Sequence, residues 1–164
     1  MISYEKVRQS LRSTTIGIII VSIIEVIIYG FVLGGLVLTQ AMLTNDEYRA
    51  QLDAQLASQG ISSSDVAATI TPLDMALLAF FALISLVITI FAIINLSRLK
   101  HGRAIIMVPY YLGVAFAGYG IISGLLKFAL VTVAIQALIL ALFIYALLQA
   151  RKLLEVEATD NDNF

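Results

Sequence analysis

The sequence predicts an all-α integral membrane protein, a four-helix bundle with a short extracytoplasmic helical cap between its first and second spans. Only 13% of the 164 residues are charged and the mean hydropathy is +0.98, whereas soluble domains carry ~25% charged residues. A hydrocarbon core of ~30 Å needs ~20 helical residues to cross it. Four apolar runs of 22 or 23 residues meet that length: Ile16–Leu38, Met75–Leu96, Ala104–Leu126 and Phe128–Ala150.

One membrane domain is predicted over residues 1–153, since the chain has no room for a second folded unit. Its spans are expected at about 14–40, 72–97, 104–123 and 125–151. The first run follows Lys6, Arg8 and Arg12, as the core of a signal peptide would. A signal core is only ~7–15 apolar residues long and precedes a small-residue cleavage site. This run is longer and no A-x-A pattern follows it, so it is predicted to be retained.

The positive residues sort between the two ends of the spans. Eight of the ten fall on one side if the chain crosses four times, and only Arg49 and Lys127 fall on the other. Positive residues resist translocation. The sorting therefore predicts a multi-pass protein of the cell membrane with both termini in the cytoplasm. The eight residues are Lys6, Arg8, Arg12, Arg98, Lys100, Arg103, Arg151 and Lys152.

The segment before the first span, Ser3–Arg12, carries an apolar stripe of Tyr4, Val7 and Leu11 among basic residues. This pattern is typical of a helix that lies in the headgroup region. It equally fits a solvated lead-in turn of the first span, and the sequence leaves both interpretations open.

The outer cap is expected over residues 44–71. Thr44 and Glu47 fit a capping box, which predicts a helix near residues 45–59 that ends at Gly60. A second short helix is expected at about 65–70, capped from the serines at 62–64. Thr71-Pro72 with Asp74 then begins the second span, since proline is tolerated in the first turn. The acidic residues of the cap are interpreted as a solvated face, because no calcium-loop spacing appears.

The third and fourth spans are expected to form a tight hairpin, punctuated by Ser123-Gly124 and Lys127. Pro109 lies in the first turns of the third span and is expected to kink it. The polar tail, residues 154–164, is predicted to be disordered because it carries acids and amides and few apolar residues.

Glu25 is the most informative polar residue, because it lies near the middle of the first span. A charge at that depth costs ~2.5–3.5 kcal/mol on insertion scales. Glu25 is therefore expected to face the bundle interior, with Ser22 and Tyr29 on the same helical face and Gln136 of the fourth span at similar depth. One interpretation is a proton- or cation-coupled binding site. The other is a neutral acid that holds two helices together.

A lone membrane Glu in the first of four short spans resembles the small multidrug resistance carriers. The resemblance covers Glu25 and the number of spans. It implies a carboxylate that binds cations and protons. The chain departs from that pattern in having no tryptophan and in a polar loop of about thirty residues after the first span.

Small residues at four-residue spacing predict faces for close helix packing, either within the chain or with another chain. They occur in the first, third and fourth spans. These candidates are Gly30, Gly34, Gly113, Ala117, Gly120, Gly124, Ala134, Ala137 and Ala141.

A basic loop between the second and third spans is expected to contact anionic headgroups. Its residues are Arg98, Lys100, His101 and Arg103. Asn95 at the inner end of the second span is expected to cap or snorkel. Tyr110, Tyr111 and Tyr119 are interpreted as interface anchors or packing residues, with a lipid or ligand pocket as the alternative.

The chain has no cysteine, no nucleophile–His–acid set and no phosphate-binding loop, so no catalytic residue, cofactor or metal is predicted. The sequence favours a non-enzymatic accessory or interaction subunit of a cell-membrane assembly, with the bilayer and other membrane chains as its partners. No nucleic-acid partner is predicted, because a net charge of −1 gives no hint of one. The assembly can be formed by copies of the same chain. The alternatives are a small proton- or cation-coupled carrier or channel at Glu25, and a membrane enzyme acting on lipid.

Overall fold

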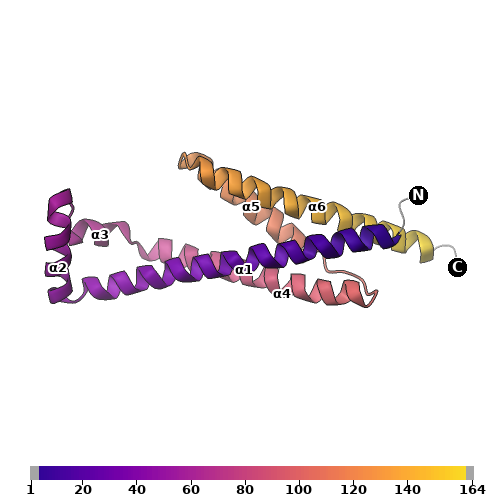
Figure 1. The fold of residues 1–164 in the computed structure, drawn as a ribbon, viewed down its shortest axis with the longest axis horizontal. Coiled ribbons are helices and arrows are strands. Elements are labelled where there is room, and N and C mark those ends of the chain that lie inside the picture. The colour runs from indigo at the N-terminus through magenta and orange to yellow at the C-terminus, as the bar shows by residue number, and fades with distance from the viewer. Residues whose placement is uncertain (1–3, 162–164) are drawn as a thin grey trace. The chain divides into compact units, whose positions relative to one another are not determined.

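The computed structural model describes residues 4–161, and its regular elements there are helices, with no strand (Figure 1). Four of the helices are long and apolar enough to cross a membrane: α1, α4, α5 and α6 as far as Val156. The predicted fold class, an all-α multi-pass membrane protein, is confirmed. The elements are α1 (Tyr4–Leu43), α2 (Asp46–Leu56), the 3₁₀ helix η1 (Ala57–Gln59), α3 (Ser63–Thr69), α4 (Pro72–Lys100), α5 (Val108–Leu126) and α6 (Leu130–Asn161).

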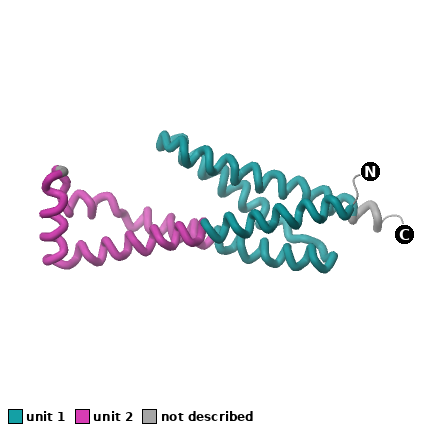
Figure 2. Tube along the Cα trace, viewed as in Figure 1, with its two compact units in different colours: residues 1–24, 84–164 teal, residues 25–83 magenta. Residues whose placement is uncertain are grey.

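The described chain divides into two compact units, where the sequence predicts one membrane domain (Figure 2). Unit 1 contains the chain up to Ile24 and from Ile84 onward, so it holds the first half of α1, the second half of α4, and both α5 and α6. Unit 2 contains Glu25–Leu83, which are the remaining halves of α1 and α4 with the cap helices between them.

The apolar core of unit 1 gathers side chains from all four of its helices. Helix α1 supplies Leu11, α4 supplies Ile88, α5 supplies Tyr110 and α6 supplies Phe143, each no more than 1% exposed. The start of α1 and the end of α6 meet in this core, and both described ends of the chain lie at the same end of unit 1 (Figure 1). An even number of crossings requires this placement.

The N-terminal stripe packs inside the protein. Val7 is 4% exposed and Leu11 is fully buried, and Tyr4 packs against the same core. Helix α1 is continuous from Tyr4 to Leu43. The interpretation of this segment as a helix lying in the headgroups is therefore wrong, because its apolar side faces α4 and α6; the segment is the lead-in of the first span.

Helices α5 and α6 form an antiparallel hairpin with very close backbones. A Cβ atom added at Gly113 would lie 2.1 Å from the ring of Phe143, and one added at Gly124 would lie 2.8 Å from Val133. Ala117, between them on the same face of α5, is fully buried. Small side chains are required on this face, because any larger group would push the two helices apart.

The turn of this hairpin contains a strained residue. Phe128 has a φ of 53° and is 89% exposed. A left-handed conformation costs a non-glycine residue roughly 1–2 kcal/mol, and Phe128 has little burial to compensate. It is held there because the Phe128 and Ala129 backbone N–H groups donate to the last carbonyls of α5, on Leu125 and Gly124.

We therefore expect Phe128→Gly to stabilise the protein by about 0.5–1 kcal/mol, since glycine adopts this φ without strain. The measurement is unfolding in mixed detergent micelles. Leu126→Gly is the matched control, because Leu126 is 77% exposed but helical, so glycine should destabilise it by about 1 kcal/mol. Equal losses in both variants would show that the turn is not strained.

The boundaries of the third and fourth spans differ from the prediction. Helix α5 begins at Val108 instead of 104, and Pro109 lies in its first turn, where its missing N–H costs nothing and no kink follows. Helix α6 runs to Asn161, so the predicted disorder of residues 154–161 is wrong. Leu153 is 2% exposed and Leu154 packs against the core, which anchors the helix past the span. Residues 162–164 of the predicted tail lie outside the described residues.

Unit 2 carries the cap, and its helix boundaries follow local capping. The N-cap of α2 is Asn45, whose Oδ1 accepts the Glu47 backbone N–H at 3.0 Å. The predicted cap at Thr44 is wrong, because the Thr44 hydroxyl donates to the Ala41 carbonyl at the end of α1 instead. Gly60 ends η1 with a φ of 69°, as its position predicts.

Two reciprocal caps begin the next helices. Ser62 and Asp65 form a capping box on α3. Before α4, the Asp74 N–H donates to the Thr71 hydroxyl at 3.1 Å, and that hydroxyl donates to the Asp74 carboxylate. The predicted start of the second span at Pro72 is confirmed.

Asp53 ties α2 to α3. Its Oδ1 accepts the Ser63 backbone N–H at 2.6 Å, and this hydrogen bond, with help from the Ser63 hydroxyl and the nearby Arg49 charge, lowers the pKa of Asp53 below its ordinary 3.8. A lowered carboxyl pKa stabilises the folded cap above the unfolded pKa, and the contribution disappears as the pH falls through the lower, folded value.

We expect the Asp53 carboxyl carbon to titrate below pH 3.8 by NMR, with the Ser63 amide resonance moving over the same range. Asp53→Asn removes the titrating group, so the Ser63 amide should no longer respond to Asp53 in that range. A titration midpoint at or above 3.8 in the folded protein would contradict the hydrogen bond's effect on the pKa.

Candidate functional site

The predicted intramembrane polar set centres on Glu25, which is 8% exposed. Ser22 precedes it by three residues on α1 and is fully buried, and its hydroxyl oxygen has no hydrogen-bond partner among residues 4–161. Within unit 2, the half-buried Tyr29 follows Glu25 by one turn and packs its ring against Phe81 of α4, with 6.0 Å between centroids. These helical positions share one face, as their spacing requires.

Gln136 belongs to unit 1, and its contacts are with α5. A Cβ added at Gly120 would lie 2.7 Å from Gln136 Cδ, so the amide lies directly on the α5 backbone. Its Oε1 is buried with no hydrogen-bond partner in the described part of the chain. Glu25 belongs to unit 2. A pairing of Glu25 with Gln136 stays a prediction.

A second buried polar cluster lies at the basic end of unit 1, the end at which Arg8 of α1 donates a hydrogen bond to the Lys100 carbonyl of α4. The Thr15 hydroxyl donates to the Leu11 carbonyl at 2.8 Å and shares a 3.1 Å hydrogen bond with the Tyr110 hydroxyl. Thr15 and Tyr110 are both fully buried. This bond joins α1 to the first turn of α5, although the two residues are far apart in the sequence.

Asn95 completes this cluster by fixing the connection between α4 and α5. Its amide nitrogen donates to the Ile106 carbonyl at 2.6 Å, and its Oδ1 accepts the Ile106 N–H at 2.8 Å. Asn95 is fully buried, so the prediction that it snorkels is wrong. These two bonds satisfy the backbone N–H and carbonyl of Ile106, which has no helical partners because it lies before the start of α5.

Sequence reasoning missed this cluster as a unit. The available signal was spacing: Ser85, Ile88, Ala92, Asn95 and Leu99 recur at three- and four-residue intervals and are all buried in α4. An Asn in that register faces the core. Its partner could not be found from spacing, because Ile106 lies in a segment without regular structure.

The small-residue faces separate into two groups. Gly113, Ala117, Gly120 and Gly124 lie against α6 in the hairpin. Gly30 and Gly34 are exposed, and a Cβ added at either would meet nothing within 4 Å. The predicted alanine stripe of α6 also points away from the unit 1 core. Its members are Ala134, Ala137 and Ala141, all exposed.

Two side chains of the basic loop contact backbone carbonyls, where the sequence predicts contact with headgroups. The Arg98 guanidinium donates to the Ala104 carbonyl at 2.9 Å, and His101 Nδ1 lies 2.8 Å from the Ser97 carbonyl. These two side chains hold the loop, while Lys100 and Arg103 are exposed. Tyr111 is half exposed, and its hydroxyl accepts a 3.1 Å hydrogen bond from Arg151.

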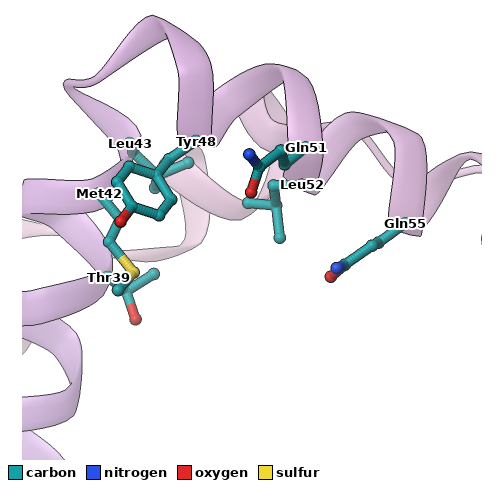
Figure 3. A pocket seen from close by; sticks show the side chains of 7 residues that line it. All are labelled: Thr39, Met42, Leu43, Tyr48, Gln51, Leu52 and Gln55. Atoms are coloured by element: carbon teal, nitrogen blue, oxygen red, sulfur yellow. The ribbon is translucent and has the colours of Figure 1, made fainter.

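The cap end of unit 2 contains a small hollow between the last turns of α1 and helix α2 (Figure 3). Its volume is about 270 Å³. Leu52 is half-buried and Tyr48 is 51% exposed there, so these two side chains of α2 cover the end of α1 only in part. The seven lining residues are Thr39, Met42, Leu43, Tyr48, Gln51, Leu52 and Gln55.

Comparison of the chain with protein-family models, with curated proteins and with solved structures finds no match. The likeness to small multidrug resistance carriers stays a likeness at Glu25 and in the number of spans. The function must therefore be inferred from the chemistry of these residues alone.

Proposed function

We propose that this protein is a non-enzymatic accessory or interaction subunit of a membrane protein assembly, self-association included. The observation that carries the proposal is the contrast between two G-x-x-x-G pairs. Helix α6 packs against Gly120 and Gly124, whereas a Cβ atom added at Gly30 or Gly34 would have no neighbour within 4 Å. In lipid, open small-residue faces allow the backbone of another helix to approach closely.

The exposed alanines of α6 support the same proposal from a second helix. Ala134, Ala137 and Ala141 lie outside the core, where larger residues would serve equally well against lipid. Small side chains lose little rotamer entropy when a second helix packs on them. Two open small-residue faces therefore favour a chain that associates with other membrane helices over one that is a monomer.

The orientation is proposed from charge. At the basic end of unit 1, Arg8 of α1 donates a hydrogen bond to the Lys100 carbonyl at the end of α4. Arg12 follows Arg8 by one turn of α1, and Arg103 lies three residues beyond Lys100. Since positive residues are retained on the cytoplasmic side, we place this end on the cytoplasmic side of the cell membrane. The cap of unit 2 is then placed on the extracytoplasmic side.

The test is association in mild detergent. An affinity-tagged copy is co-expressed with a differently tagged copy, purified, and analysed for the second copy and for other membrane chains. We expect reproducible capture, and a loss of at least tenfold when Gly30 and Gly34 are both changed to Val. Gly118→Val is the control, since a Cβ at Gly118 also meets nothing within 4 Å. A monomer without partners would contradict the proposal.

The second candidate function is a small proton- or cation-coupled carrier at Glu25. It is favoured by one observation, a carboxyl 8% exposed inside a predicted span. Glu25→Gln keeps the size and removes the exchangeable charge. A carrier would lose proton-coupled flux in liposomes while staying folded, whereas an interaction subunit would show no flux in either form and would keep its partners.

A further inference from the structure

We propose that the basic end of unit 1 contains a binding site for a phosphate-bearing anion, the headgroup phosphate of an anionic phospholipid. The site is a hollow of about 400 Å³ between the first turns of α1 and the last turn of α4. It carries three cationic side chains and one carboxylate, a net charge of +2. The lining residues are Glu5, Arg8, Gln9, Arg12, Leu99 and Lys100.

Arg8 is held in place by the end of α4. Its Nε donates to the Leu99 carbonyl at 2.7 Å, and its Nη2 donates to the Lys100 carbonyl at 3.2 Å. These carbonyls belong to the last turn of α4, where the helix dipole is negative and four carbonyls lack helical partners. Arg8 therefore neutralises this helix end and fixes one wall of the hollow before any ligand arrives.

Arg12 and Lys100 supply the free positive charge. Both are exposed, and within residues 4–161 neither side chain makes a hydrogen bond or ion pair. With Arg8 fixed in the same hollow, these two exposed cations can contact a phosphate from α1 and from α4. Such charge-assisted hydrogen bonds are among the strong ones. Glu5 and Gln9 are left to contact the hydroxyl groups of a headgroup such as glycerol.

The depth of the hollow matches that of lipid phosphates. Arg12 precedes the apolar run at Ile16 by four residues, and Lys100 follows the run that ends at Leu96 by four residues. At ~1.5 Å per helical residue, both lie ~6 Å outside the hydrocarbon boundary. The headgroup layer is roughly 5–7 Å thick on each side. A soluble phosphate ester has the same chemistry, but the depth favours the lipid.

The experiment measures lipid binding to the full chain, delipidated in detergent, by native mass spectrometry. Phosphatidylglycerol and phosphatidylcholine are titrated separately, and soluble glycerol phosphate is added as a competitor. We expect phosphatidylglycerol to bind at least tenfold more tightly than phosphatidylcholine. Arg12→Gln with Lys100→Gln should weaken phosphatidylglycerol ~20–30-fold, since each basic residue near the surface contributes ~1 kcal/mol.

The matched control is Lys6→Gln with Lys152→Gln, which removes the same charge from exposed positions outside the hollow. It should weaken binding less than about threefold, and both double variants should unfold at the same temperature without lipid. Equal weakening by the two pairs, or no weakening by the first, would overturn the site. Displacement of the lipid by equimolar glycerol phosphate would overturn the assignment to a lipid headgroup.

Discussion

Replacing Gly113 with alanine is expected to destabilise the protein more than any other single methyl group added to α5. The new Cβ would lie 2.1 Å from two ring atoms of Phe143, which is 1% exposed and cannot swing away. Relief requires the α5 and α6 backbones to separate, and overpacking of this kind costs about 1–3 kcal/mol. The measurement is the free energy of unfolding in mixed detergent micelles.

The control for this variant is Gly118→Ala on the same helix. A Cβ at Gly118 meets nothing within 4 Å. The alanine should therefore raise stability by about 0.5–1 kcal/mol through helix propensity alone. If Gly113→Ala is as stable as Gly118→Ala, the close approach of α5 and α6 is not present. Pairing Gly113→Ala with Phe143→Leu should recover part of the loss.

Replacing Asn95 with alanine is the second large expected effect. It leaves the Ile106 N–H and carbonyl without the partners that now lie 2.8 and 2.6 Å away. Each unsatisfied buried polar group costs about 1–3 kcal/mol, which gives about 2–6 kcal/mol for two groups. Both hydrogen bonds are only part-buried, so we expect the variant to lose about 2–4 kcal/mol, in the lower part of that range. Hydrogen exchange of the Ile106 amide gives a local measurement and should become markedly faster than in the unmodified protein.

Ser97→Ala provides the comparison for Asn95→Ala, because Ser97 is exposed on the same turn of α4. We expect a change within about 0.5 kcal/mol and unaltered exchange at Ile106. Should Asn95→Ala leave the Ile106 amide as protected as before, the connection between α4 and α5 must be held by other contacts.

Sequence reasoning succeeded wherever the information was local. Apolar length located the four spans. The end of the cap helix at Gly60, a cap among the serines at 62–64 and the start of α4 at Pro72 were found because each depends on residues within one turn. It failed at the start of α2, because Thr44 and Asn45 are adjacent and both residue types can cap a helix. The structure shows that Asn45 is the cap. It also failed at the tail, because composition does not show that Leu153 and Leu154 have a core to pack against.

The candidate sites were less predictable, because they depend on contacts between distant parts of the chain. Burial of Glu25 follows from its depth in an apolar run, and the structure places it at 8% exposure. The pairs Gly30/Gly34 and Gly120/Gly124 have the same spacing in the sequence. That spacing could not show that α6 covers the second pair and that the first is exposed. Nor could Arg8 be assigned to the end of α4, which is over ninety residues away along the chain.

The most direct test of the proposed membrane arrangement is the accessibility of single cysteines, since the chain has none of its own. Ser58→Cys, His101→Cys and Lys152→Cys place thiols at three exposed positions. In intact cells, a membrane-impermeant maleimide should label the cysteine at 58 and should label those at 101 and 152 only after lysis. Labelling of 101 and 152 from opposite sides, or of 58 from the same side as 101, would contradict the four-span arrangement.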